Sequence, residues 1–285
     1  MTSPSILITG CSSGIGLRAA ELLHARGYQV YATARKTEDL EKLTQIGVSA
    51  LALDVTDYQQ LDDVLDFIAK DNDGKLDALF NNAGYSQVGA AEDLPLEALK
   101  AQFETNFFAP VEIGNRVIRR FFRPQGQGRI IQNTSVFGLT SLPFRAAYCS
   151  SKYALEGFSD ALRQEQNNFN TNIHISIIEP GPIVSRVREN KQLYFEKYIA
   201  PIMDNSPYRE TYIKMQSALA MTGRIPMTLE PDAVVDKLIH ALESSNPAPR
   251  YYVTTLTHIF ANAKRLLPHR SFDKFAAKIS KSETG

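Results

Sequence analysis

Tyr148 and Lys152 are the two residues of this sequence whose types and spacing most directly point to chemistry. They lie four residues apart in the segment YCSSK, so on a helix they would stand one above the other on the same face. A free tyrosine has a pKa of about 10 and is a poor base at neutral pH. A neighbouring ammonium group favours the phenolate and lowers that pKa. Tyr148 is the only one of the 12 tyrosines with a lysine at this offset, so we predict an acid/base pair here.

A glycine-rich turn near the N-terminus stands where a nucleotide phosphate would bind. Its spacing is GxxxGxG, and it joins a strand predicted over Ser5–Thr9 to a helix predicted over Ile15–Arg26. Glycines let backbone amides approach phosphate oxygens, and a helix N-terminus adds about half a positive charge. A nucleotide site is therefore favoured over a plain turn. Its candidate contacts are Thr9, Gly10, Ser12, Ser13, Gly14, Ile15 and Gly16.

The residues after the second and third predicted strands indicate which nucleotide binds. An acidic residue at the end of the second strand would accept the ribose hydroxyls of NAD, but this strand is followed by Arg35 and Lys36. These cations could bind the 2′-phosphate of NADP, or they could be a solvated pair that begins a polar loop. Asp54 and Val55 follow the third strand and could contact the adenine. Asp54 could equally cap the following turn.

Short β-rich segments alternate with longer helical patterns along the chain. This order is typical of a Rossmann-type α/β fold, a doubly wound parallel sheet of about seven strands with helices on both faces. The predicted strands are Ser5–Thr9, Gln29–Ala34, Ser49–Leu53, Leu76–Asn81, Arg129–Ser135, Ile173–Ile178 and Arg250–Thr254. The predicted helices include Ile15–Arg26, Leu61–Lys70, Glu97–Arg120, Ala147–Asn167 and Pro231–Glu243.

Two segments depart from this alternation, and neither is separated from the rest by a linker. About 186–227 is an aromatic- and methionine-rich insertion, which could be a substrate lid or helices that pack on the body. About 255–285 has two amphipathic helical patterns and many cations. Such an extension could lie on a membrane surface, but docking on its own domain or on a second subunit is favoured. We predict one domain over residues 1–285.

Composition excludes several classes of function. The chain has 31 Lys and Arg and 31 Asp and Glu, so its net charge gives no attraction to nucleic acid. Cys11 and Cys149 form no CxxC pair, and the five histidines have no HExxH spacing, so no metal is expected. No leader pattern and no run of about 18 apolar residues is present. We expect a soluble, cytoplasmic protein that acts on a small molecule.

With these elements in order, the sequence resembles the short-chain dehydrogenase/reductase family over nearly its whole length. The resemblance rests on the turn from Thr9 to Gly16, the run Asn81-Asn82-Ala83-Gly84, Asn106, Ser135, Tyr148, Lys152 and Pro180-Gly181. It implies a tetrad in which Tyr148 is the acid/base, Ser135 polarises the carbonyl, Lys152 binds the nicotinamide ribose and Asn106 holds a water. It implies further cofactor contacts at Asn81, Ala83, Gly84, Pro180, Gly181 and Ile183, and at Ser185, where many relatives have threonine.

The resemblance also implies a reaction. Within the family the sequence looks most like 17β-hydroxysteroid and retinol dehydrogenases and bacterial NADPH-dependent aldehyde reductases. The expected activity is hydride transfer between NADPH and an apolar aldehyde or ketone, with a steroid or retinoid alcohol dehydrogenase as the alternative. A non-catalytic NADP-sensing module is disfavoured because such a module needs neither Tyr148 nor Ser135. Relatives are commonly dimers or tetramers, so a homodimer or homotetramer is expected.

Overall fold

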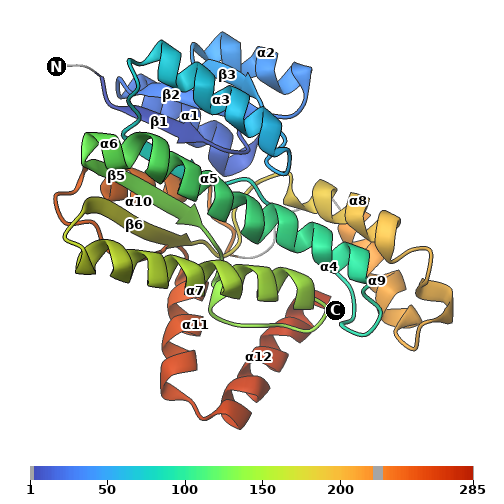
Figure 1. Cartoon of the computed structure of the whole chain (residues 1–285). Helices are drawn as coiled ribbons and strands as arrows, with labels where there is room; N and C mark the ends of the chain where they lie inside the picture. The colour runs from blue at the N-terminus through green and yellow to red at the C-terminus, as the bar shows by residue number, and fades with distance from the viewer. Residues whose placement is uncertain (1–2, 221–226, 285) are drawn as a thin grey trace.

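A seven-stranded parallel sheet forms the centre of the computed structural model, which describes residues 3–220 and 227–284 (Figure 1). The strand order is β3-β2-β1-β4-β5-β6-β7, which confirms the predicted doubly wound sheet. The order reverses between β1 and β4, and ligands of such sheets bind at the carboxyl ends of the strands around this point. The strands are β1 (Ser5–Ile8), β2 (Gln29–Ala34), β3 (Ser49–Ala52), β4 (Ala78–Asn81), β5 (Gln127–Asn133), β6 (Asn172–Glu179) and β7 (Arg250–Tyr252).

Helices cover both faces of the sheet because side chains of each strand alternate between the two faces. In β1, Ile6 and Ile8 belong to one buried cluster and Leu7 to the other. The first cluster is completed by α1 (Gly14–Ala25), α2 (Thr37–Ile46) and α10 (Asp232–Glu243). The second is completed by α3 (Tyr58–Asp71), α5 (Ala109–Val117) and α7 (Ala146–Asn168). Helix α2 is not among the predicted helices; it begins directly after Arg35 and Lys36, for which the start of a polar loop was one of two interpretations.

The segment predicted as a long helix over Glu97–Arg120 is a helical path with two π-helical turns. Its parts are α4 (Leu96–Phe103), η1 (Glu104–Phe108), α5, η2 (Ile118–Phe122) and α6 (Arg123–Gln125). In η1, the N–H of Ala109 donates to the carbonyl of Glu104, five residues back. Pro110 has no N–H and cannot continue the regular bonding pattern toward Asn106. Asn106 therefore lies in a π turn, a feature that is frequent at functional sites.

The insertion forms α8 (Val187–Tyr198), a short 3₁₀ turn η4 (Met203–Asn205) and α9 (Arg209–Ala220). The predicted insertion extended to about 227, and residues 221–226 lie outside the described part of the chain. Phe195, Ile199, Tyr212 and Met215 are buried in one cluster with Val88 of the body. For these side chains the structure bears out the interpretation of helices packed on the body.

The C-terminal extension forms a hairpin of α11 (Thr255–Leu266) and α12 (His269–Thr284), which projects beyond α7 (Figure 1). Phe260 of α11 and Phe272 of α12 are buried in a cluster with Val136 and Leu142 of the loop after β5. The base of the hairpin therefore docks on its own chain, as expected. No helix among the described residues is long and apolar enough to cross a membrane.

A buried ionic cluster connects β6, β7 and α7. The Arg250 guanidinium donates to Glu179 at 3.0 Å, to Glu156 at 3.0 Å and to Asp160 at 2.7 and 3.0 Å. Glu179 is fully buried, and burial, with the Glu156 carboxylate beside it, raises the pKa of Glu179 above its usual range. One arginine thus holds the partly exposed Asp160 and two buried carboxylates, Glu156 and Glu179, whose burial without it would be costly.

We predict that Arg250→Met destabilises the fold in a pH-dependent way. Removal of one partner from a buried ion pair costs about 3–5 kcal/mol. Glu156 and Glu179 are harder to ionise in the folded than in the unfolded chain, so the loss should grow as the pH rises through their raised pKa values. Urea unfolding at pH 6 and pH 8 measures this.

Arg26→Met is the matched control, because Arg26 makes a two-bond contact with Glu243 at the surface, where both side chains are more than 40% exposed. This change should cost far less than Arg250→Met at either pH, because a solvated surface ion pair contributes little to stability. Equal losses for the two variants would show that the cluster is not what stabilises this edge of the sheet.

Candidate active site

The glycine turn forms a tight cradle at the carboxyl end of β1. Gly10 and Gly14 have φ values of +73° and +57°, in the region that favours glycine. A Cβ at Gly16 would lie 2.3 Å from the Gly10 carbonyl oxygen, and one at Gly14 would lie 2.8 Å from the Ser185 Cβ. Ser13, at the start of α1, makes no side-chain capping bond. A phosphate fits here, where it can accept from backbone N–H groups at the N-terminus of α1.

Asn82 connects this turn to the two strands beside it. Its Nδ2 donates to the carbonyls of Thr9 at 2.9 Å and Gly10 at 3.1 Å. Its Oδ1 accepts from Asn133 Nδ2 at 2.9 Å. The Thr9 hydroxyl accepts from the N–H groups of Asn82 and Ala83, each at 3.0 Å. The Thr9 hydroxyl thus holds the backbone that follows β4. Asn82 was predicted only as part of the motif Asn81-Asn82-Ala83-Gly84, and the structure shows that its side chain connects the site.

Asn81 and Asn106 fix nearby backbone segments through side-chain hydrogen bonds. Asn81 Nδ2 donates to the Pro110 carbonyl at 2.9 Å, which attaches the end of β4 to the helix that contains the π turn. Asn106 Oδ1 accepts from the Tyr85 N–H at 3.1 Å, and its Nδ2 donates to the Tyr85 carbonyl at 2.9 Å. A Cβ at Gly84 would lie 3.1 Å from Asn106 Oδ1. The backbone at Gly84 and Tyr85, which follows β4, is thereby in close contact with Asn106 of the predicted tetrad.

Ser135, Tyr148 and Lys152 come together from the loop after β5 and the first turns of α7. The Ser135 hydroxyl lies beside the Tyr148 phenol. The Lys152 ammonium lies 5.9 Å from the centre of the Tyr148 ring and donates to the Asn133 carbonyl at 2.8 Å. Phe137 packs its ring edge against Tyr148 at 6.0 Å. The structure thus assembles the predicted pair and the predicted polarising hydroxyl.

Burial dominates the electrostatics of this group. It raises the pKa of Tyr148 to about 12, opposed by the hydrogen bond from Ser135. Burial also lowers the pKa of Lys152 to about 8, opposed by the Glu156 carboxylate. Desolvation penalises the charged forms of both groups, the phenolate of Tyr148 and the ammonium of Lys152. At pH 7, Tyr148 is a phenol and can donate a proton.

The residues after β2 and β3 are also neighbours. Arg35 Nη1 lies 4.0 Å from Asp54 Oδ2, and the Arg35 side chain is 66% exposed. Lys36 is exposed before α2. Asp54 Oδ1 accepts from the N–H and the hydroxyl of Thr56, as a turn-capping residue does. The Val55 side chain is buried in the core beneath the sheet. The cations are therefore exposed, while the side chains of Asp54 and Val55 have contacts within the protein.

The loop 180–185 spans the space between the strand end of Ser135 and the glycine turn. The Pro180 carbonyl accepts from the Val136 N–H at 2.8 Å. A Cβ at Gly181 would lie 2.2 Å from Thr254 Oγ1, so glycine is required by this close approach. Ile183 forms a bridge with the strand-like segment that follows the insertion. All the predicted contact segments thus meet at one edge of the sheet.

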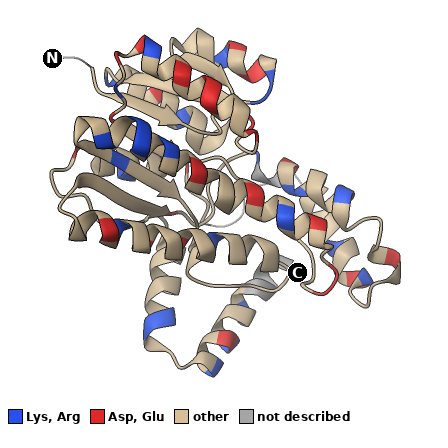
Figure 2. Cartoon of the chain, in the orientation of Figure 1, with Lys and Arg blue, Asp and Glu red and all other residues tan. Residues whose placement is uncertain are grey.

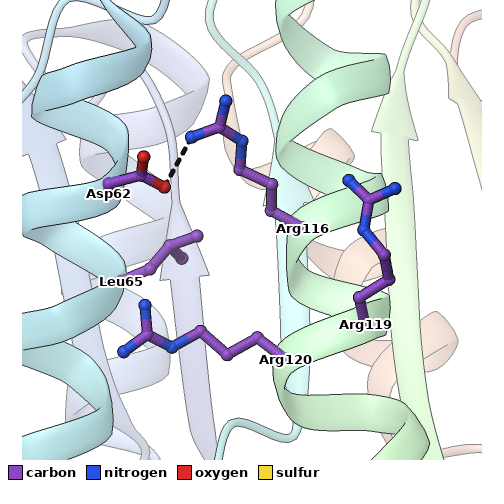
Figure 3. Close-up of a pocket in the computed structure, with 5 residues that line it drawn as sticks. All are labelled: Asp62, Leu65, Arg116, Arg119 and Arg120. Carbon is purple, nitrogen blue, oxygen red and sulfur yellow. Dashed lines mark hydrogen bonds and ion pairs between the residues drawn. The ribbon is translucent and has the colours of Figure 1, made fainter.

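Two cavities bear on where a ligand binds. One of about 330 Å³ is lined by Ser13, Gly14, Ser185 and neighbouring residues, beside the glycine turn. The other lies between α3 and the helical path 109–122 and is lined by Asp62, Leu65, Arg116, Arg119 and Arg120 (Figure 3). It contains no predicted site residue, and Arg116 is paired with Asp62. Within the described ranges, no three His, Cys, Asp and Glu side chains gather as metal ligands.

Comparison with known proteins agrees with this geometry. The family model for short chain dehydrogenases matches residues 4–193. Over 270 residues the chain is 38% identical to an uncharacterized oxidoreductase of Escherichia coli strain K12, YbbO, which covers 95% of this chain and 93% of that protein. It is 31% identical to the NADPH-dependent 3-dehydrocapnine reductase of Ornithobacterium rhinotracheale, with 98% of each chain covered. A short-chain dehydrogenase from Streptomyces avermitilis superposes with a TM-score of 0.73 at 26% identity, covering 99% of this chain and 97% of that one. The chain therefore belongs to the short chain dehydrogenase family.

Proposed function

We propose that this protein is an NADPH-dependent carbonyl reductase that acts on apolar aldehydes or ketones. The observation that carries the proposal is that Ser135 and the Lys152 ammonium lie beside the Tyr148 phenol, whose pKa burial raises to about 12. A phenol of this kind gives up a proton only to a strongly basic acceptor, such as the oxygen of a carbonyl that is being reduced. The nicotinamide of the cofactor would supply the hydride.

In this proposal the tetrad residues have distinct roles. Ser135 donates a hydrogen bond that polarises the carbonyl, and Tyr148 transfers its proton to the carbonyl oxygen. The Lys152 ammonium, held by the Asn133 carbonyl at 2.8 Å, binds the nicotinamide ribose and balances the phenolate that remains. Asn106 holds the water that returns a proton to Tyr148.

The preference for an apolar substrate is supported by the aromatic wall beside the tetrad. Tyr85, whose backbone fixes Asn106, stacks on Tyr194 of α8 with ring centres 3.8 Å apart. Phe137 borders Tyr148 from the other side. We place α8 and α9 in the role of a lid over one Rossmann domain, and we expect a cytoplasmic homodimer or homotetramer.

The preference for NADPH is supported by the exposed Arg35 at the end of β2, where no carboxylate stands. The related reductase of O. rhinotracheale is named as NADPH-dependent. The 2′-phosphate would be bound by Arg35 with Lys36. The remaining proposed contacts are Thr9, Gly10, Ser12, Ser13, Gly14, Ile15, Gly16, Asp54, Val55, Asn81, Ala83, Gly84, Pro180, Gly181, Ile183 and Ser185.

The pH profile of carbonyl reduction tests the roles of Tyr148 and Lys152. Reduction needs the phenol and the ammonium, and both are protonated below the Lys152 pKa of about 8. We expect kcat/KM to be nearly constant from pH 6 to 7.5 and to fall above pH 8. In Lys152→Arg the guanidinium keeps its charge to a pH of about 12 or more, so a slower enzyme without this fall is expected. A wild-type rate that rises from pH 7 to 9 would contradict the assignment.

Substitution of the tetrad tests the activity itself. Tyr148→Phe should lower kcat by about 10²–10⁴-fold, since it removes the proton donor and keeps the ring. Ser135→Ala should lower kcat by about 10²–10³-fold, as for a polarising donor. NADPH oxidation across a panel of aldehydes, ketones, steroids and retinoids measures both. Tight NADPH binding with no turnover of any carbonyl by the wild type would indicate a sensor instead.

Substitution of Arg35 tests the choice of cofactor. A charge-assisted hydrogen bond is worth about 1.5–3 kcal/mol, so Arg35→Ala should raise the KM for NADPH by one to two orders of magnitude. The KM for NADH should barely change, because that cofactor has no 2′-phosphate. Arg119→Ala is a matched control, since Arg119 is 67% exposed in η2 and lines the cavity that contains no predicted site residue. A wild-type enzyme that prefers NADH would overturn the assignment.

A further inference from the structure

The tip of the C-terminal hairpin, residues 264–271, is exposed throughout. It contains Leu266, which is 80% exposed, and Leu267, which is 38% exposed. Ile259, which precedes Leu266 by two turns of α11, is also 44% exposed. Apolar side chains of this size in a contiguous exposed segment indicate an interaction surface. The base of the hairpin, by contrast, is buried against the loop after β5.

The tip and the following turns of α12 carry mostly positive charge. Residues 264–278 hold five Lys and Arg and one Asp, in a chain whose total charge is zero. Cations are visible on both arms of the hairpin (Figure 2). Lys264 and Arg265 face the body, where they donate to the hydroxyls of Tyr153 and Tyr252. Arg270, Lys274 and Lys278 recur every four residues on α12, and among the described residues none of the three forms an ion pair with a carboxylate.

We propose that this tip binds the surface of an anionic membrane. The two leucines would enter the headgroup region, and the cations of α12 would contact the lipid phosphates, a combination typical of peripheral amphipathic anchors. A second copy of this chain is a poorer fit, because the basic tip would meet another basic tip in a symmetric contact. The apolar residues and the charge thus favour one occupant, an anionic lipid surface.

The anchor bears on the active site through the base of the hairpin. Phe260 and Phe272 belong to the same buried cluster as Val136, which directly follows Ser135. A helix of the length of α11 spans about 18 Å, so a bound tip holds the body close to the lipid surface, where apolar aldehydes and ketones concentrate. This benefit rests on the proposed function, but binding of the tip to lipid does not.

Sedimentation of the full-length protein with vesicles tests the proposal. Wild type should bind vesicles of phosphatidylglycerol and phosphatidylcholine, bind pure phosphatidylcholine at least tenfold more weakly, and lose affinity as salt is raised, because salt screens exposed charges. Leu266→Glu/Leu267→Glu should reduce affinity for the anionic vesicles by at least tenfold. Arg270→Glu/Lys274→Glu should do the same, since each cation near an anionic surface contributes about fivefold.

Two matched controls isolate the tip. Leu96→Glu replaces a leucine of α4 that is 64% exposed by glutamate, with one added negative charge in place of two. Lys70→Glu/Lys75→Glu changes the net charge by the same amount at exposed lysines in and after α3. Neither should change affinity more than twofold. Equal losses in the controls, or no binding of wild type to the anionic vesicles, would overturn the proposal.

Two further measurements separate this proposal from its alternatives. If the leucine variant changes the molar mass in light scattering and leaves vesicle binding intact, the tip is a contact between copies and the proposal is wrong. Reduction of a water-soluble aldehyde should be unchanged in all the tip variants. A protein that binds vesicles through the tip and reduces no carbonyl would refute the proposed function and leave the lipid anchor standing.

Discussion

The hydrogen bonds of the Asn82 side chain are the constraint on which the site depends. A single amide group holds two carbonyls of the glycine turn and the side chain of Asn133. Asn133 in turn accepts from the Lys152 ammonium through its carbonyl. Both the N–H group and the carbonyl oxygen of the Asn82 amide are therefore hydrogen-bonded, at the end of the sheet where the strand order reverses between β1 and β4. The proposed phosphate cradle is thus connected to the proposed catalytic lysine through the hydrogen bonds of Asn82 and Asn133.

A second constraint runs along one face of α7. Tyr148, Lys152, Glu156 and Asp160 follow each other at intervals of four residues, so they form a continuous stripe. Proton chemistry is proposed at its first two members, and Arg250 neutralises its last two. Glu156 also accepts from the Thr134 hydroxyl, next to Ser135. The same buried helix face thus positions the reactive groups and compensates the cost of their desolvation.

The α8–α9 insertion and the α11–α12 hairpin both pack on loops of the candidate active site. The α8–α9 insertion buries Phe195 and Tyr212 against the body and stacks Tyr194 on Tyr85. The α11–α12 hairpin buries Phe260 beside Val136. Movement of either element would be transmitted to the backbone next to Asn106 or Ser135, because closely packed contacts do not deform freely.

The sequence by itself determined the sheet, the family and the identity of the residues that meet at its edge. Buried parallel strands read as apolar runs, and the glycine turn, Tyr148 and Lys152 have fixed local spacing, so these features need no long-range information. The helix at α2 was missed because its amphipathic pattern is short and follows two cations that begin a polar segment.

Only the tertiary structure decided how these groups behave. The π turn at Asn106 depends on how the helix path accommodates Pro110. The rise in the Tyr148 pKa depends on burial by segments far apart in the chain. The role of Asn82 depends on β1, β4 and β5 lying side by side. Desolvation and long-range hydrogen bonds are properties of the assembled molecule, and no spacing along the chain records them.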